Sequence, residues 1–137
     1  MTATTPFTAQ RSGVYRAPAD ARGLRERAGA AQLAWLEAGL AHVNDKAGLL
    51  AALAAAAGFP PGFGHNWDAL ADSLADFSWR PAGGYVLYLR NTAAAQRALG
   101  AEWAMLLGVL RGAAGEWKAR GRIFVALVDD ARFPPWP

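Results

Sequence analysis

The chain has no cysteine among its 137 residues. This excludes a disulfide framework, a thiolate nucleophile and a cysteine-ligated metal site. It also has no apolar run of the length that spans a bilayer, because its longest alanine-rich stretch is interrupted by Gly58, Pro60 and Pro61. Residues 1–11 lack the apolar segment of a secretory signal. We therefore expect a soluble, cytoplasmic protein that needs no cofactor.

Positive charge is missing from one part of a chain that is otherwise basic. The sequence has 14 Lys and Arg residues against 11 Asp and Glu, a net charge of +3. Its basic residues are scattered without forming a block, which makes a weak case for nucleic-acid binding. Between Lys46 and Arg80, however, there is no basic residue at all. The only charged side chains in this stretch are three aspartates.

These aspartates belong to a segment, residues 66–77, with the period of an amphipathic helix. A Gly/Pro-rich turn over residues 58–64 precedes it, and Asn66 is placed to cap its first turn. At about 100° per residue, four apolar residues share one side of the helix and the carboxylates share the other. The apolar side carries Trp67, Leu70, Leu74 and Phe77, and the opposite side carries Asp68, Asp72 and Asp76.

A row of carboxylates spaced i, i+4 and i+8 is unfavourable for an isolated helix. Each like-charge pair costs about 0.2–0.5 kcal/mol. The helix dipole offsets this cost for Asp68, in the first turn, but hardly for Asp72 or Asp76. From the residues alone, two interpretations stay open: an ordinary solvated helix face, or a surface that meets a cationic partner.

The segment Phe-Gly-His-Asn-Trp-Asp-Ala-Leu-Ala-Asp-Ser-Leu, residues 63–74, resembles the signature of the barstar family. Members of that family are intracellular inhibitors of barnase-type ribonucleases. The resemblance implies an α/β fold in which helices pack on a small, three-stranded parallel sheet. It also implies a protein that is not an enzyme. Its expected partner is an extracellular or toxic guanyl-type ribonuclease, without a membrane and without direct contact to nucleic acid.

The resemblance further implies which residues bind that partner. Asp72 enters the enzyme's phosphate-binding cluster, where its carboxylate replaces an RNA phosphate, and Asp68 meets neighbouring cations. The remaining expected contacts are Asp76, Asn66, Gly64, Phe63 and Trp67, the last of which can either pack inward or stand at the rim. Three positions depart from the family pattern. Gly62 replaces an aromatic residue, Ala71 replaces a partner-facing tryptophan, and Gly112 replaces a supporting acid.

The family order of elements, together with two strongly apolar segments, predicts strands at 32–40, 85–90 and 123–128. This gives a barstar-like domain over residues 31–130, followed by a proline-rich tail at 131–137. Residues 1–30 form an N-terminal extension that is partly disordered, with one short helix from Asp20 to Ala31. Within it, residues 13–16 are either a short strand or an edge contact.

The most regular amphipathic pattern predicts a long helix over residues 101–119. It contains Gly108, Gly112 and Gly115, each unfavourable by up to about 1 kcal/mol relative to alanine. We therefore expect either a close neighbour beside these glycines or a break near Gly115.

Other functions have less support. His65, Asp68 and Asp72 can supply only part of a metal coordination shell, and no zinc-protease, EF-hand or P-loop motif is present. The main alternative to an inhibitor is a non-inhibitory protein-binding module of the same fold, with a different regulatory partner. A third is direct RNA binding, which predicts an interaction with RNA alone that weakens as salt rises.

Overall fold

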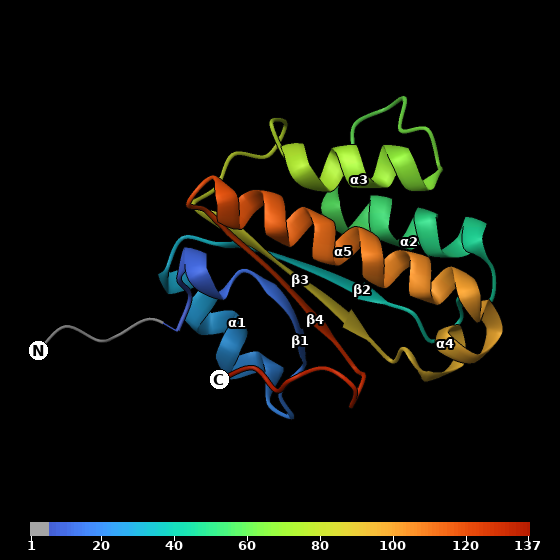
Figure 1. Ribbon diagram of the computed structural model, residues 1–137, viewed down its shortest axis with the longest axis horizontal. Helices are drawn as coiled ribbons and strands as arrows, with labels where there is room; N and C mark the ends of the chain where they lie inside the picture. Colours follow the sequence, from blue (N-terminus) through green and yellow to red (C-terminus); the bar gives the residue numbers. More distant parts are fainter. Residues whose placement is uncertain (1–5) are drawn as a thin grey trace, which may run out of the picture.

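The computed structural model describes residues 6–137 as one parallel β-sheet with helices on both faces (Figure 1). The strands lie in the order β1-β4-β3-β2. In chain order the elements are the 3₁₀ helix η1 (Ala9–Arg11), β1 (Gly13–Arg16), α1 (Ala21–Ala30), β2 (Ala34–Gly39), α2 (Lys46–Ala57), α3 (Trp67–Asp76), β3 (Gly84–Arg90), α4 (Ala93–Leu99), α5 (Ala101–Ala119) and β4 (Ile123–Val128).

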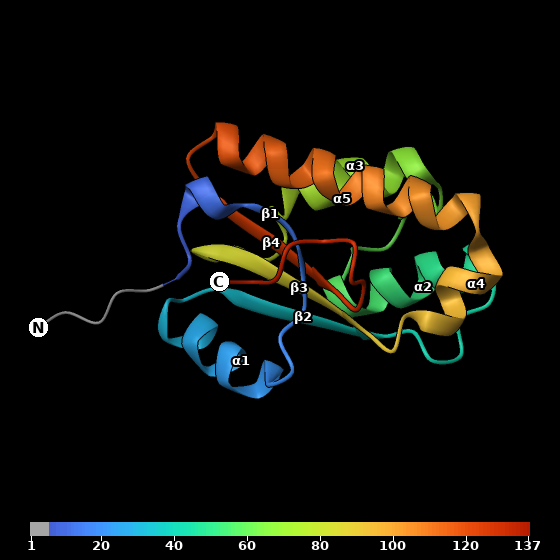
Figure 2. The same cartoon turned by 60° about the horizontal axis from the view of Figure 1, so that its bottom comes forward.

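The strand order explains why the helices divide between the two faces. From β2 the chain steps to the adjacent β3 and then to the adjacent β4. Right-handed crossovers in that direction place α2 to α5 on one face. The connection from β1 to β2 crosses the sheet in the opposite direction, so the same handedness places α1 on the other face. Figures 1 and 2 show this arrangement, with α1 alone beneath the sheet.

The α/β class and the parallel sheet are confirmed, but the predicted number of strands is wrong. The strands expected at 32–40, 85–90 and 123–128 are β2, β3 and β4. Residues 13–16 add a fourth, β1, which pairs with β4 so that Val14 lies opposite Ala126. Four residues are too few to show a clear period, and their partner strand is more than a hundred positions away. Residues 13–16 therefore supply one edge of the sheet.

The sheet is covered on both faces, as continuous apolar strands require. Every residue of β4 after Ile123 is buried. One core fills the space between the sheet and helices α2, α3 and α5, and it includes Leu36, Leu70 and Trp117. A second, smaller core joins α1 to the opposite face of the sheet.

The C-terminal tail runs along the outer edge of β1. The Arg16 amide donates to the Pro134 carbonyl at 2.8 Å, and the Trp136 amide donates to the Arg16 carbonyl at 3.2 Å. The Trp136 ring stacks on Phe7 and meets the edge of Tyr15, with ring centroids 5.0 and 4.9 Å apart. Prolines lack the amide that a further strand would need, so the tail closes this edge of the sheet.

The turn before the tail contains a partly buried ion pair that makes stability depend on pH. The Asp130 side chain is only 5% exposed and accepts hydrogen bonds from the Arg132 guanidinium, with the shortest at 2.6 Å. These bonds hold the pKa of Asp130 below its usual range, although burial opposes the shift. The ionised pair therefore stabilises the fold above the unfolded-state pKa of about 3.9 and loses this contribution as pH falls through the lower folded-state value.

We expect Asp130→Asn to lower the free energy of unfolding at neutral pH by about 1–2 kcal/mol. The loss should be modest for a hydrogen-bonded charge pair, because Arg132 is largely exposed and solvent screens its charge. The difference between wild type and variant should shrink as the pH falls below about 4. Urea unfolding at a series of pH values measures both quantities. A difference that stays constant down to the acid limit would show that the charge of Asp130 does not contribute.

Helix α5 is continuous from Ala101 to Ala119, so the expected break near Gly115 is wrong. The alternative expectation, a close neighbour, is also wrong. A Cβ atom built on Gly108, Gly112 or Gly115 would meet nothing within 4 Å. These glycines face open space, and periodicity alone cannot distinguish that situation from close packing.

We therefore expect Gly115→Ala to raise the free energy of unfolding by about 0.4–1 kcal/mol, because it reduces the freedom of the unfolded chain without a clash. Gly84→Ala is the matched control with the opposite sign. A Cβ there would lie 2.8 Å from side-chain atoms of both Ile123 and Leu33. Thermal unfolding of the two variants checks the pair, and a destabilised Gly115→Ala would contradict the open environment.

Candidate protein-binding surface

Helix α3 is fixed at both ends by interactions that the sequence specifies. At its start, the Asn66 side-chain oxygen accepts from the Ala69 amide at 2.7 Å, as predicted for an N-cap. At its end, Phe77 adopts a left-handed conformation with φ 52°. The last-turn carbonyls of Leu74 and Ala75 accept from the Trp117 indole at 2.8 Å and from Arg120 at 2.7 Å. The helix is therefore a rigid support for its outer side chains.

The apolar side of α3 faces inward and its carboxylates face outward, as the period predicts. Leu70 and Leu74 are fully buried. Asp68, Asp72 and Asp76 are all exposed. Within residues 6–137, the ion pairs closer than 4 Å are Glu37 with Arg90 and Asp130 with Arg132.

None of the three carboxylates is thus neutralised by a basic group of the described chain, but they are not equivalent. Asp76 accepts a hydrogen bond from the Ser78 hydroxyl at 2.9 Å. Asp68 and Asp72 have no hydrogen bond from their side chains to other described residues. These two are the carboxylates most available to a partner.

The Gly/Pro-rich loop beside α3 is held by stacked aromatic rings. Phe59 packs against Phe63 and Trp79, with ring centroids 4.7 and 5.6 Å apart. The His65 ring lies 4.8 Å from the Phe63 ring, and its Nδ1 is 2.9 Å from the Phe63 carbonyl oxygen. These contacts leave Phe63 half-buried at the edge of the loop.

Gly64 lets this loop pass close to the start of α3. A Cβ there would lie 3.1 Å from the Asn66 side-chain nitrogen and 3.3 Å from the Ala69 Cβ. A shallow groove of about 300 Å³ separates the loop from the helix. Asp72 forms part of its wall, together with Pro60, Pro61, Gly62, Phe63, Gly64, Ala69 and Ser73.

Trp67, the first residue of α3, combines features of the two positions left open for it. It is half-buried and packs against the edge of the main core. The Lys46 ammonium lies over its ring, 5.5 Å from the centroid. The lysine that begins the cation-free stretch therefore contacts an aromatic ring and forms no ion pair with a described carboxylate.

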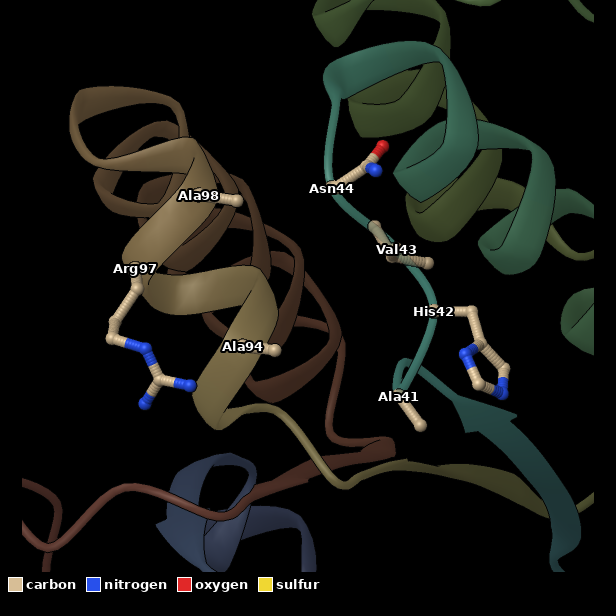
Figure 3. Close-up of a pocket in the computed structure, with 7 residues that line it drawn as sticks. All are labelled: Ala41, His42, Val43, Asn44, Ala94, Arg97 and Ala98. Atoms are coloured by element: carbon tan, nitrogen blue, oxygen red, sulfur yellow. The ribbon is translucent and has the colours of Figure 1, made fainter.

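Other hollows among the described residues are lined by different groups. One of them, of about 570 Å³ between α4 and the segment joining β2 to α2, includes His42 and Arg97. Figure 3 shows these two side chains pointing away from each other, with alanines between them. Residues 6–137 also contain no group of three His, Cys, Asp or Glu side chains arranged to hold a metal ion.

A profile of the Barstar family, described as barstar (barnase inhibitor), matches residues 33–129, well over half of the chain. The chain belongs to the barstar family. Among curated proteins, none matches it. In the part of the chain that the structure describes, no helix is long and apolar enough to cross a membrane.

The structure also places the three small residues at which the resemblance implied a departure from the family signature. Gly62 and Gly112 are exposed, and a Cβ at either position would meet nothing within 4 Å. Ala71 is half-buried on α3, directly before Asp72 in the sequence. These three small residues present little side-chain surface.

Proposed function

We propose that this protein inhibits a ribonuclease by placing carboxylates of α3 in the enzyme's active site, where they replace the phosphate of RNA. One observation carries the proposal. Asp68 and Asp72 are exposed on a rigid helix, and no basic group of the described chain neutralises them. Family membership supplies the class of partner.

The local structure is suited to rapid, tight binding. No ion pair within residues 6–137 has to break before Asp72 can meet the Arg, Lys and His side chains that bind a scissile phosphate. Carboxylate–guanidinium hydrogen bonds are charge-assisted and can be bidentate. Because α3 is capped and packed beforehand, little conformational entropy is lost on binding. Opposite charges on the two surfaces also accelerate encounter, an effect that salt screens.

The neighbouring residues have supporting roles in this proposal. Asn66 and Gly64 fix the loop against the start of α3, while Phe63 and Trp67 provide aromatic surface beside the carboxylates. Asp76 contributes less than Asp72, because its hydrogen bond with Ser78 would compete with a partner.

The partner we propose is a secreted or toxic guanyl-type ribonuclease whose activity the cytoplasm must be protected from. The sparse surface at Gly62, Ala71 and Gly112 favours an enzyme whose own side chains fill that space. We therefore expect a cognate enzyme that differs in shape from barnase around its active site.

The proposal is tested by titrating the protein into guanyl-type ribonucleases, including any nuclease that co-purifies with it from the native cell. We expect stoichiometric loss of RNA cleavage by one of them, weakened at high salt. Tight binding of a partner without loss of activity would instead support a non-inhibitory binding module. Salt-dependent binding of RNA alone, with no effect on any nuclease, would contradict inhibition.

A further inference from the structure

A cluster of three arginines lies beyond the C-terminal end of α3, and the proposed inhibition does not use it. Arg80 follows α3, Arg120 follows α5, and Arg122 precedes β4. Figure 1 shows that α3 and α5 end where β3 and β4 begin. All three side chains are exposed.

Two of these arginines are fixed on the same aromatic ring. The guanidinium carbons of Arg120 and Arg122 lie 4.5 and 5.0 Å from the centroid of Trp117, which is only 1% exposed. Each guanidinium is also held by a backbone carbonyl. Arg120 donates to Ala75 at 2.7 Å, and Arg122 donates to Ala82 at 2.9 Å. The two cations are therefore preorganised, which reduces the entropy lost when they bind a ligand.

The third arginine joins the cluster through Tyr85, whose ring centroid is 5.4 Å from that of Trp117. The Tyr85 hydroxyl donates to the Arg80 carbonyl. Burial raises the pKa of Tyr85, and the positive charges of Arg122 and Arg80 oppose this rise, while Asp76 adds to it. The Arg80 backbone therefore lies beside the Trp117–Tyr85 pair, at the same corner of the molecule as Arg120 and Arg122.

The cluster has no counter-ion in residues 6–137. None of the three guanidinium groups comes within 4 Å of a carboxylate, and this includes those of Asp76 and Glu116. Like charges gathered on one ring repel each other, and a bound anion would remove that repulsion. Each guanidinium has five N–H donors, and the hydrogen bonds described above leave several of them free.

We propose that Arg80, Arg120 and Arg122 form a binding site for a phosphate group. A phosphate ester or inorganic phosphate carries up to two negative charges and several acceptor oxygens, which suit three cations better than a single carboxylate does. Planar guanidinium groups match phosphate oxygens in a bidentate manner, and contact with the Trp117 ring restrains two of them. The source of the phosphate is either a free anion or the backbone of RNA.

The site is tested by NMR titration of the full chain with sodium pyrophosphate, with the arginine side-chain N–H signals as readout. We expect the signals of Arg120 and Arg122 to shift and that of Arg97 to stay unchanged. Arg120→Gln and Arg122→Gln should each weaken binding about tenfold or more, because hydrogen bonds to a charged group are lost. Arg122→Lys, which keeps the charge without the planar fork, should weaken it by less. Arg97→Gln, a change of an exposed arginine on α4, is the matched control.

A second titration, with a short single-stranded RNA, identifies the source. Tighter binding of RNA than of pyrophosphate through the same arginines indicates a nucleic-acid backbone, and equal or weaker binding indicates a free anion. Both results support the phosphate site. Equal weakening by Arg97→Gln, or the absence of shifts at Arg120 and Arg122, would overturn it. So would a polyglutamate peptide that binds this cluster more tightly than either phosphate ligand. Failure here leaves ribonuclease inhibition through Asp72 unaffected, because the two sites use different residues.

Discussion

Asp72→Ala is expected to weaken binding to the cognate ribonuclease by about thirtyfold or more, since truncating one partner of a desolvated interfacial charge pair costs 2 kcal/mol or more. The enzyme's cations would then face a groove wall without its carboxylate. Most of the loss should appear as faster dissociation, because the buried charge pair acts after encounter. Surface plasmon resonance or a stoichiometric inhibition assay measures it.

Two further variants make this expectation specific. Asp72→Asn keeps the side-chain shape and removes the charge, so it should lose nearly as much affinity as alanine does. Glu26→Ala removes an exposed acid from α1, on the opposite face of the sheet, and should leave the affinity almost unchanged. Similar losses for Asp72→Ala and Glu26→Ala would mean that only the overall charge of the protein matters.

Local sequence signals predicted the candidate surface well. Asn66, the apolar period and the proline-rich turn together specify where α3 begins and which side it buries, because each signal acts within a few residues. The exposed position of Asp72 follows from that same period. Its lack of an ion pair does not follow from the period, because a sequence alone does not show which arginines fold close to a given carboxylate. The three-dimensional structure shows that none within residues 6–137 pairs with Asp72.

Features that depend on distant residues were left open or missed. For residues 13–16 the sequence allowed either a short strand or an edge contact. Strand β1 is defined by its pairing with β4, across most of the chain, and four residues with one alternation carry little signal of their own. The arginine cluster was missed for the same reason. Arg80 is 40 positions from Arg120, and in the sequence both appear as members of a scattered basic set. The nearest sequence signal is Trp117, three positions before Arg120 and five before Arg122, and its helical spacing predicted only a core residue.

Leu74→Ala is expected to lower the free energy of unfolding by about 2–5 kcal/mol, because it removes a buried side chain and leaves a cavity that neighbours fill only in part. Leu74 is fully buried in the main core, beneath the helix turn that carries Asp72. The loss should appear as a lower midpoint in urea with an unchanged slope.

This variant also separates the stability of α3 from the chemistry of its outer face. Ser73→Ala, a half-buried neighbour, is the control and should change stability by no more than about 0.5 kcal/mol. Asp72→Ala should be as stable as wild type or slightly more so, because it relieves like-charge repulsion at i, i+4. The two variants should therefore have opposite effects. Asp72→Ala should lose affinity for the ribonuclease and keep its stability, whereas folded Leu74→Ala should lose stability and keep most of its affinity. If Asp72→Ala unfolded as readily as Leu74→Ala, the carboxylate would be part of what holds the fold together, and its exposure could not be explained by a partner.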